Sequence, residues 1–324
     1  MPELPEVETV ARDLRPLVVG KTILRAWWSG KKLRLPWQQG WTSRVKGWTF
    51  LDVKRRAKWL VFYLGKDDES CVGEKDSRCP KLIAHLGMTG QLTFSPGGDS
   101  VSDTFLPQDH VHLRFELART QNLAGRVMPK KGGGCSETGA LRFRDVRRFG
   151  GFYLAGNQDE LEAFFEKHRL GPEPWDCPLQ DWKKSLSKTS RAIKAVLLDQ
   201  AVISGVGNIY ADECLHAAGI HPCRQSHSLN QSEASRLLKQ AARVMVRAIE
   251  NRGSTIRDYV GGENLNGRNQ DFLRVYGREG QPCLTCGTSL SRWVVGGRSS
   301  HFCPQCQPAP RFISDSPNAS GGRR

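Results

Sequence analysis

The first six residues of the chain, MPELPE, combine an amine with two carboxylates that could cleave bonds at a sugar carbon. Removal of Met1 is expected because Pro2 is compact, and it leaves Pro2 with a free secondary amine. An α-amino group has a pKa of about 7.7–8.0, so a useful fraction of this amine is nucleophilic near neutral pH. Attack on a sugar C1′ gives an iminium ion that favours cleavage and elimination along the sugar. Glu3 and Glu6 supply carboxylates for proton transfer.

The same stretch also has a purely structural interpretation. Apolar residues recur with helical period from Pro5 to Val19, and Gly20 is placed to end that helix. Proline is common in the first turn of a helix, so Pro5 needs no catalytic explanation. Taken alone, this segment favours the structural interpretation, and the other motifs of the chain must decide.

A second reactive group lies near the end of the chain. Two Cys-x2-Cys pairs are separated by sixteen residues, a spacing typical of a zinc-binding β-hairpin. Four thiolates leave no coordination position for water, so we expect one structural Zn²⁺ held by Cys283, Cys286, Cys303 and Cys306. Two disulfides are the alternative, which a reducing compartment disfavours. Arg298 lies at the expected hairpin turn, where an arginine can bind phosphate but is also often simply solvated.

The composition favours a polyanionic partner. The 324 residues carry 48 basic and 33 acidic side chains, a formal net charge of +15, and nucleic acid is the first candidate. No run of eighteen apolar residues and no basic-then-apolar leader occurs, so we expect a cytoplasmic, nucleoid-associated protein without a membrane segment. In such a reducing setting we interpret six scattered cysteines as free thiols: Cys71, Cys79, Cys135, Cys177, Cys214 and Cys223. Cys71 and Cys79, both within the insertion 65–80, could pair under oxidation, but nothing in the sequence requires it.

The middle of the chain changes texture twice. After Gly20, short apolar runs separated by Gly, Pro and Asp predict an antiparallel sandwich or barrel, with strands in 21–28, 48–64, 81–94, 110–117 and 140–154. Two polar insertions, 65–80 and 118–139, are predicted to be solvent loops. Helical periodicity then appears in 188–199, 211–218 and 231–251, and the last helix has a capping pair in Asn230 and Glu233.

These patterns predict a multidomain α+β protein. An N-terminal β-sandwich with its N-terminal helix would occupy residues 2–155, and a linker would occupy 156–178. A helical domain would follow in 179–262. The region 263–306 would hold the zinc hairpin, and the polar residues 307–324 are predicted to be a disordered tail.

Four motifs stand in one order along the chain: PELPEVETV, RRAKW, GVGNIYADE and the four-cysteine hairpin that contains GGR. Together they resemble the bifunctional formamidopyrimidine-DNA glycosylases, bacterial enzymes that excise oxidised purines. The resemblance covers nearly all of residues 2–306 apart from the two insertions. It implies that 179–262 is a helix–two-turns–helix domain, and that the protein acts as a monomer on damaged double-stranded DNA.

The resemblance also implies roles for individual residues. Pro2 would form the Schiff base with C1′ of the damaged nucleotide, and Glu3 would be the general acid. Glu6 would be a buried partner that organises the pocket. Lys58, in RRAKW, would contact phosphate and transfer protons during β-elimination. Arg298 would bind phosphate and assist δ-elimination.

Further matched positions are implied to hold the DNA backbone. Asn208, in GVGNIY, would bind phosphate through its side chain and the neighbouring backbone N–H groups. Four other residues match places where the family touches phosphate: His110, Arg148, Arg191 and Lys194. Holding the backbone on both sides of one nucleotide lowers the cost of rotating that nucleotide out of the stack.

Two loops would fill the space that a rotated nucleotide leaves behind. Met88, in HLGMTG, and Arg147 with Phe149, in DVRRFG, resemble the family's intercalating residues. Arg147 would pair with the orphaned base, and Phe149 would buckle the stack. Either apolar residue could instead belong to a core. Flanking glycines favour exposed loops.

The lesion itself would be read by residues that follow the third helix. Thr255, Arg257 and Tyr259 would line that pocket, and the preferred substrates would be 8-oxoguanine and formamidopyrimidines, followed by β,δ-elimination at the abasic site. One alternative is an endonuclease VIII-like glycosylase for oxidised pyrimidines, which the PELPE opening disfavours. A second alternative is a non-catalytic protein that binds damaged DNA, which the intact Pro2 and Lys58 disfavour.

Overall fold

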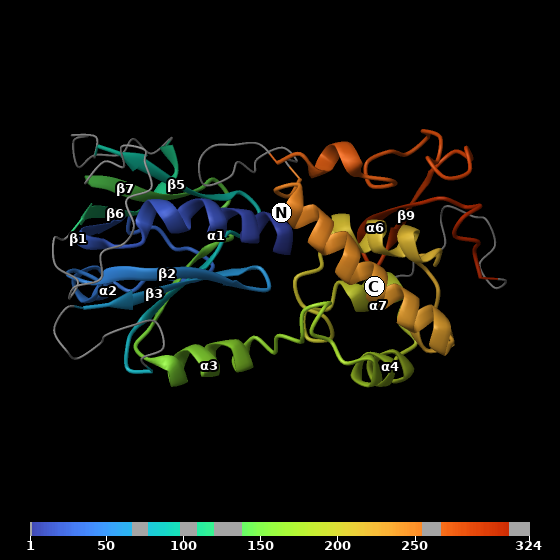
Figure 1. Cartoon of the computed structure of the whole chain (residues 1–324), viewed down its shortest axis with the longest axis horizontal. Coiled ribbons are helices and arrows are strands. Elements are labelled where there is room, and N and C mark those ends of the chain that lie inside the picture. The colour runs from blue at the N-terminus through green and yellow to red at the C-terminus, as the bar shows by residue number, and fades with distance from the viewer. Residues whose placement is uncertain (1, 67–76, 98–108, 120–137, 255–266, 311–324) are drawn as a thin grey trace. The chain divides into compact units, whose positions relative to one another are not determined.

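The computed structural model describes residues 2–66, 77–97, 109–119, 138–254 and 267–310 (Figure 1). The chain divides into two compact units. Unit 1 comprises Met1–His168 and Asn251–Gln270, and unit 2 comprises Arg169–Glu250 and Asp271–Arg324. Unit 1 contains a large antiparallel sheet, and unit 2 contains helices and a two-stranded hairpin. The predicted α+β class is therefore confirmed.

Eight strands of unit 1 form one sheet in the order β5-β7-β6-β1-β2-β3-β4-β8, and every pair in it is antiparallel. They are formed by the apolar runs that the sequence predicted to be strands. Their bounds are β1 Lys21–Trp28, β2 Thr49–Arg56, β3 Trp59–Gly65, β4 Lys81–His85, β5 Gly90–Pro96, β6 Val111–Arg119, β7 Thr138–Asp145 and β8 Gly151–Ala155.

This single sheet folds over to make the sandwich. Strand β8 is at one end of the strand order and β7 is next to the other end. Nevertheless the rings of Phe152 on β8 and Phe143 on β7 have centroids only 5.3 Å apart, and Phe152 lies 5.9 Å from Phe115 on β6. Two halves of one continuous sheet therefore face each other across an aromatic core, as in a two-layer sandwich.

Helix α1, Leu4–Val18, packs its apolar face into the same core, with Val7, Val10 and Leu14 buried. It is also attached to β2 by polar contacts. The Arg15 guanidinium lies 2.7 Å from the Asp52 carboxylate and donates to the Val53 carbonyl at 2.6 Å. These contacts hold the helix, and hence the start of the chain, on the sheet. Among its described residues, unit 1 has two more α-helices, α2 Trp41–Arg44 and α3 Gln158–Lys167.

Unit 2 contains four α-helices and the hairpin among its described residues: α4 Leu179–Ser187, α5 Ile193–Leu197, α6 Asn208–Ala218, α7 Gln231–Glu250, β9 Ser291–Val295 and β10 Arg298–Phe302. The predicted cap of α7 is confirmed, because Asn230 and Glu233 exchange two hydrogen bonds of 2.9 Å each. The helix predicted over 188–199 is wrong in its length. The N–H groups of Ile193 and Lys194 donate to carbonyls of Arg224 and Pro222, so α5 begins only at Ile193.

One prediction about the cysteines needs correction. Cys177, Cys214 and Cys223 are free thiols, as expected, but Cys79 is disulfide-bonded. A reducing compartment disfavours disulfides in general. Whether a particular cysteine pairs depends on how closely its Cβ approaches the Cβ of a second cysteine, which composition does not reveal. Cys71 and Cys135 lie outside the described residues. Among the helices of the described ranges, none combines the length and apolarity required for a bilayer crossing.

Candidate active site and nucleic-acid interface

The start of α1 holds the predicted catalytic residues. Pro2, Glu3 and Glu6 are all buried, and Glu3 is the N-cap of the helix. One carboxylate oxygen of Glu6 accepts from the Glu3 N–H at 2.8 Å, and the other accepts from the Ser254 N–H at 2.7 Å. Glu6 therefore orients the first residues of the chain and joins them to a distant segment. This arrangement agrees with its expected role as a buried organising residue.

That distant segment is attached to α1 at a second point. Both carboxylate oxygens of Asp13 accept from the Arg252 guanidinium at 2.8 Å, and Asp13 is buried. The segment is also paired with residues beyond 255–266, since the Asn269 N–H donates to the Gly253 carbonyl at 2.9 Å. The described residues that precede the predicted lesion pocket are thus attached to α1. The pocket residues Thr255, Arg257 and Tyr259 lie outside the described residues.

Lys58 lies in the two-residue turn between β2 and β3, after Ala57, whose φ is +52°. Its side chain is mostly enclosed, with a relative exposure of 7%. The turn is held against α1 by Arg55, which donates to the Ala57 carbonyl at 3.3 Å and to the Glu8 carboxylate at 2.8 Å. Burial opposes ionisation of Glu8, but hydrogen bonds and charge from Arg55 and Arg12 prevail, so the pKa of Glu8 is lowered.

His85 is a functional candidate that the sequence reasoning missed. Burial, followed by the positive charges of Lys58 and Arg34, lowers the pKa of His85 to about 3, so its ring is neutral at physiological pH. Its Nδ1 accepts from the Gly87 N–H at 2.9 Å, which leaves the proton on Nε2. A cavity of about 220 Å³ adjoins the ring and is lined by Arg34, Leu35, Trp59, His85, Phe149 and His168. The feature of the sequence that could have identified His85 is its position three residues before Met88, one of the predicted intercalating residues.

The structure brings the three predicted intercalating residues together. Met88 lies in the turn between β4 and β5, and Arg147 and Phe149 lie between β7 and β8. A Cβ on Gly87, whose φ is +63°, would come within 2.4 Å of the Phe149 backbone, so the two loops touch only because this residue is glycine. Phe149 is 40% exposed, and the Arg147 guanidinium stacks on its ring at 4.7 Å. Both side chains belong to surface loops and not to the core.

Asp145 joins these two loops and was not singled out from the sequence. Its side chain is fully buried, and its carboxylate accepts from the Thr89 hydroxyl at 2.5 Å, the Gly150 N–H at 2.8 Å and the Arg147 N–H at 3.2 Å. A carboxylate at the end of a strand, directly before a turn, is the signal that could have identified it.

Two further predicted phosphate contacts lie near the same loops. His110 has φ +52°, and its carbonyl accepts from the Asp145 N–H at 3.0 Å. Arg148 has φ +56°, and its carbonyl accepts from the Arg34 N–H at 3.1 Å. Both residues are therefore in turns whose backbones are fixed by neighbouring strands and loops. Arg148 is exposed, and His110 is partly buried.

In unit 2, Asn208 is the first residue of α6 and follows the glycine-rich turn. The N–H groups at such a helix start attract phosphate. Its side-chain amide donates to the Ser299 carbonyl at 3.1 Å, so the turn and the hairpin are in direct contact. Arg191 is exposed, so it is accessible to DNA. Its guanidinium lies 2.9 Å from the Asp199 carboxylate.

Lys194 does not fit its predicted phosphate contact. Its side chain has no solvent exposure, and its ammonium lies 2.7 Å from the Asp212 carboxylate and 2.5 Å from the Ser299 carbonyl. A buried ammonium that is already paired cannot also reach a phosphate in solvent. The sequence match placed a cation at this position, but packing in the folded protein directs the Lys194 side chain into the interior.

The four predicted metal ligands converge. Their sulfur atoms all lie within 4.8 Å of one another, and two pairs are 3.4 and 3.9 Å apart. A tetrahedral zinc with Zn–S bonds of about 2.3 Å places its sulfurs about 3.8 Å apart, so the cluster fits one structural Zn²⁺. Hydrogen bonds from Thr288 lower the pKa of Cys286 to about 6, whereas burial raises the pKa of Cys303 and of Cys306. A bound Zn²⁺ would hold all four sulfurs as thiolates.

Arg298 is the first residue of β10 and is exposed beside the hairpin turn. Gly296 and Gly297 form that turn with φ of +57° and +73°, the values that a tight two-residue hairpin requires. The register pairs Arg298 with Val295. The hairpin therefore presents Arg298 at its exposed tip, and the phosphate-binding role of this arginine stays a prediction.

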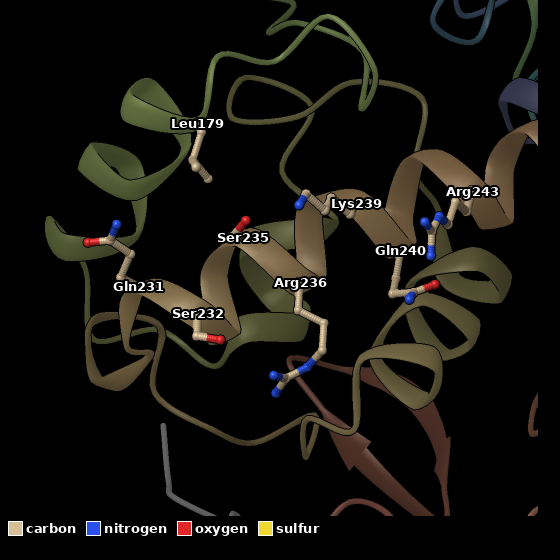
Figure 2. Close-up of a pocket in the computed structure, with 8 residues that line it drawn as sticks. All are labelled: Leu179, Gln231, Ser232, Ser235, Arg236, Lys239, Gln240 and Arg243. Carbon is tan, nitrogen blue, oxygen red and sulfur yellow. The ribbon is translucent and has the colours of Figure 1, made fainter.

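Unit 2 also has a polar groove of about 630 Å³ along α7, shown in Figure 2. It contains none of the predicted site residues. Its lining includes three cations and no carboxylate: Leu179, Gln231, Ser232, Ser235, Arg236, Lys239, Gln240 and Arg243. Because none of these cations belongs to the predicted site, substituting one of them shows how much the loss of a positive charge elsewhere changes DNA binding.

Three family models match the chain in the order of its parts. The formamidopyrimidine-DNA glycosylase N-terminal domain matches residues 1–152, the formamidopyrimidine-DNA glycosylase H2TH domain matches 170–260, and the zinc finger found in FPG and IleRS matches 280–309. The three matches cover the sheet as far as the start of β8, every described α-helix except α3, and the cysteine cluster.

Named relatives and solved structures agree with these models. A formamidopyrimidine-DNA glycosylase of Thermomicrobium roseum is 39% identical over 315 residues, covering 95% of this chain and 99% of its own. One from Symbiobacterium thermophilum is 38% identical over 329 residues, covering 100% and 95%. A Lactococcus lactis FPG variant bound to DNA containing Fapy-dG is 32% identical, with a TM-score of 0.78 over 95% of this chain and 100% of its own. The chain belongs to the formamidopyrimidine-DNA glycosylase family.

Proposed function

We propose that this chain is a bifunctional DNA glycosylase and abasic-site lyase that excises oxidised purines through a Schiff base at Pro2. The observation that carries the proposal is the buried start of α1, where Glu6 orients the Glu3 N–H and fixes the segment ending at Ser254. This geometry supports a nucleophile held at a defined place, which proximity catalysis requires. The neighbouring turn that carries Lys58 is tied to α1 by Arg55.

The proposed chemistry uses these groups in sequence. The Pro2 nitrogen attacks C1′ and forms the C1′–N bond, while the glycosidic bond breaks and Glu3 delivers a proton as the general acid. Loss of the amine proton and opening of the sugar give an iminium ion. Removal of a C2′ proton, assigned to Lys58, then expels the 3′ phosphate. A second elimination, assisted by Arg298, expels the 5′ phosphate.

The preferred substrates are proposed to be 8-oxoguanine and formamidopyrimidines in duplex DNA. The Lactococcus lactis relatives support DNA as the partner, since their structures contain Fapy-dG DNA and abasic-site DNA. One of them is bound to DNA with an oxidised pyrimidine, which keeps the endonuclease VIII-like preference as the second candidate. Matched duplexes with 8-oxoguanine or thymine glycol distinguish the two: faster excision of thymine glycol contradicts the purine assignment.

Other predictions also remain proposals. We expect a monomer in the cytoplasm, associated with the nucleoid. The proposed boundaries are a catalytic domain in 2–155, a linker in 156–178, a helix–two-turns–helix domain in 179–262 and a zinc-hairpin region in 263–306. The assigned phosphate contacts His110, Arg148, Arg191 and Asn208 belong to the same set of proposals.

Borohydride trapping tests the central proposal. The mature protein, which begins at Pro2, should become covalently joined to 8-oxoguanine DNA, because borohydride reduces the iminium to a stable amine. The same protein with one residue added before Pro2 should lose trapping and lyase activity by about 10³-fold or more, the scale of removing a nucleophile. It should still bind the DNA, since the phosphate-binding residues are unchanged. Full trapping by the extended protein would contradict the mechanism.

A further inference from the structure

The carbonyl of Ser299, the residue directly after Arg298, accepts hydrogen bonds from two helices of unit 2. It accepts from the Lys194 ammonium at 2.5 Å and from the Asn208 side-chain amide at 3.1 Å. One backbone atom thus connects the start of α5, the start of α6 and the strand that carries Arg298. The position of Arg298 along the hairpin is therefore coupled to the position of Asn208.

Asp212 closes this network from α6. One of its oxygens lies 2.7 Å from the Lys194 ammonium, and the other accepts from the His301 N–H at 2.8 Å and from the His301 ring at 3.2 Å. The side chains of Asp212 and Lys194 have no solvent exposure. Asp212 lies one helical turn after Asn208, so both residues face the hairpin from the same side of α6.

The neighbouring Glu213 holds the other side of the zinc-binding module, which comprises residues 273–307. Its buried carboxylate accepts three backbone N–H groups, from Arg274, Val275 and Tyr276, each at 2.9 Å. Consecutive carboxylates on α6 therefore grip two different segments of the module. The hydrophobic cluster inside the module is small: it consists of Val275, Cys283, Leu290 and Cys303. Outside this cluster, Phe302 is buried with its ring centroid 4.5 Å from that of His221, and the buried carboxylates add polar contacts to this packing.

We propose that Asp212 and Glu213 are positioning residues that hold the zinc-binding module on α6 and keep Arg298 in register with Asn208. The proposal rests on the proposed function, in which Arg298 and Asn208 bind phosphates of one DNA strand. Two buried carboxylates are costly to desolvate unless other groups compensate their charge. Asp212 is paired with the Lys194 ammonium and accepts from His301, and Glu213 accepts from three backbone N–H groups. They act through other groups and touch no DNA.

The test measures DNA binding as a function of salt, using a duplex that contains an uncleavable tetrahydrofuran abasic analogue. In Arg298→Ala, affinity should fall roughly 10-fold, and the slope of log K against log salt should decrease by about 0.9, the value for one lost phosphate contact. The double variant Lys194→Met with Asp212→Ala removes both buried charges together. It should reproduce the loss of affinity and slope. Added to Arg298→Ala, it should cause no further change, because it acts only through Arg298.

Controls separate positioning from general effects. The variant Arg243→Ala removes one positive charge from the α7 groove of Figure 2 and should leave the slope unchanged. Zinc content should remain one ion per chain in every variant. If the double variant loses zinc, His301→Phe is the milder test, since it keeps the ring beside Tyr276 but loses the hydrogen bond to Asp212. It should weaken binding about 3-fold, which corresponds to one modest hydrogen bond.

Each outcome has a distinct meaning. If Arg298→Ala leaves the affinity and the slope unchanged, the proposed phosphate role of Arg298 is wrong. If Arg298→Ala has the expected effect but the double variant and His301→Phe bind DNA normally, the positioning inference is wrong. Additive losses in the combined variant would also overturn it, because they would show that Asp212 acts independently of Arg298.

Discussion

The two units hold their functional side chains by different means. In unit 1, the start of α1 and the two loops predicted to intercalate are attached to a folded sheet with a large core of aliphatic and aromatic residues. In unit 2, Arg298 is carried by a small module whose internal apolar cluster contains only four buried residues, two of them metal ligands. The module relies on four thiolates and on two buried carboxylates of α6 for its position.

This difference follows from size. A large sheet can fix its loops by burying apolar area, at roughly 25 cal/mol per Å². A module of some thirty residues cannot, and small domains of this kind generally depend on metal. Unit 1 should therefore tolerate the loss of one polar contact, while the hairpin of unit 2 should fail when its metal is removed.

Loss of the metal should have the largest effect, because it should disrupt the hairpin of unit 2 and leave unit 1 folded. We expect Cys303→Ser to lose zinc and to weaken DNA binding roughly 10- to 100-fold, because Arg298 is no longer held in place. Metal analysis, calorimetry and DNA titration would measure this. The thermal transition of unit 1 should be nearly unchanged. Cys177→Ser, which replaces a buried thiol of unit 2 outside the cluster, is the matched control. A zinc-free protein with normal DNA affinity would show that the hairpin of unit 2 does not depend on metal.

A smaller effect is expected where unit 1 depends on a polar contact. Asp145→Ala removes the acceptor for Thr89, Arg147 and Gly150 and should lower the free energy of unfolding by about 1–3 kcal/mol. Excision from intact duplex should fall more than cleavage at a preformed abasic site, because the intercalating loops lose their alignment. Single-turnover rates on the two substrates would show this.

Two variants sharpen the Asp145 test. Asp145→Asn retains one acceptor oxygen and should recover part of the loss. Asp159→Ala, which removes a carboxylate in the first turn of α3, should leave both rates unchanged. Equal losses on both substrates in Asp145→Ala would mean that the residue serves the fold of unit 1 and not the loops.

The last effect concerns acid stability and is absent at neutral pH. The pKa of His85 is lowered to about 3 in the folded protein, whereas an unfolded histidine titrates near 6.5. Between these values the unfolded chain binds a proton that the folded chain does not, so stability falls as pH decreases from 6.5 towards 3. His85→Asn should reduce this loss in unit 1, with about one proton fewer taken up on unfolding.

Thermal unfolding of unit 1 at pH 7 and pH 4 would measure the change. The exposed His227→Asn in unit 2 is the control and should leave the pH dependence of unit 1 unaltered. Unit 2 has its own acid-sensitive group, since burial lowers the pKa of His221 to about 4. An identical acid loss of unit 1 in wild type and His85→Asn would contradict the assignment of this sensitivity to His85.

Sequence reasoning succeeded where local pattern decides structure. The apolar runs predicted the strands because alternation and turn residues act over a few positions. The capping pair Asn230 and Glu233 was recognisable because its partners are three residues apart. The Cys-x2-Cys pairs were equally local, and one hairpin sufficed to bring them together.

It failed where a residue's partner is distant in sequence. Lys194 was predicted to face phosphate, but Asp212 and the Ser299 carbonyl draw it into the interior. Asp145 and His85 attracted no prediction, because their importance depends on Thr89, Lys58 and other residues that only folding brings near.

By itself, then, the sequence determined the reactive groups of this protein, the metal ligands and most of the strands, because residue type and short spacing specify them. Only the tertiary structure decided which charges are buried, how one sheet folds over to meet itself at Phe143 and Phe152, and how Asp212 couples the hairpin to α6. Many of those contacts join residues far apart in sequence, such as Asp212 and His301, which are 89 positions apart. Burial and pairing energies at such contacts are properties of the packed molecule and not of any short segment.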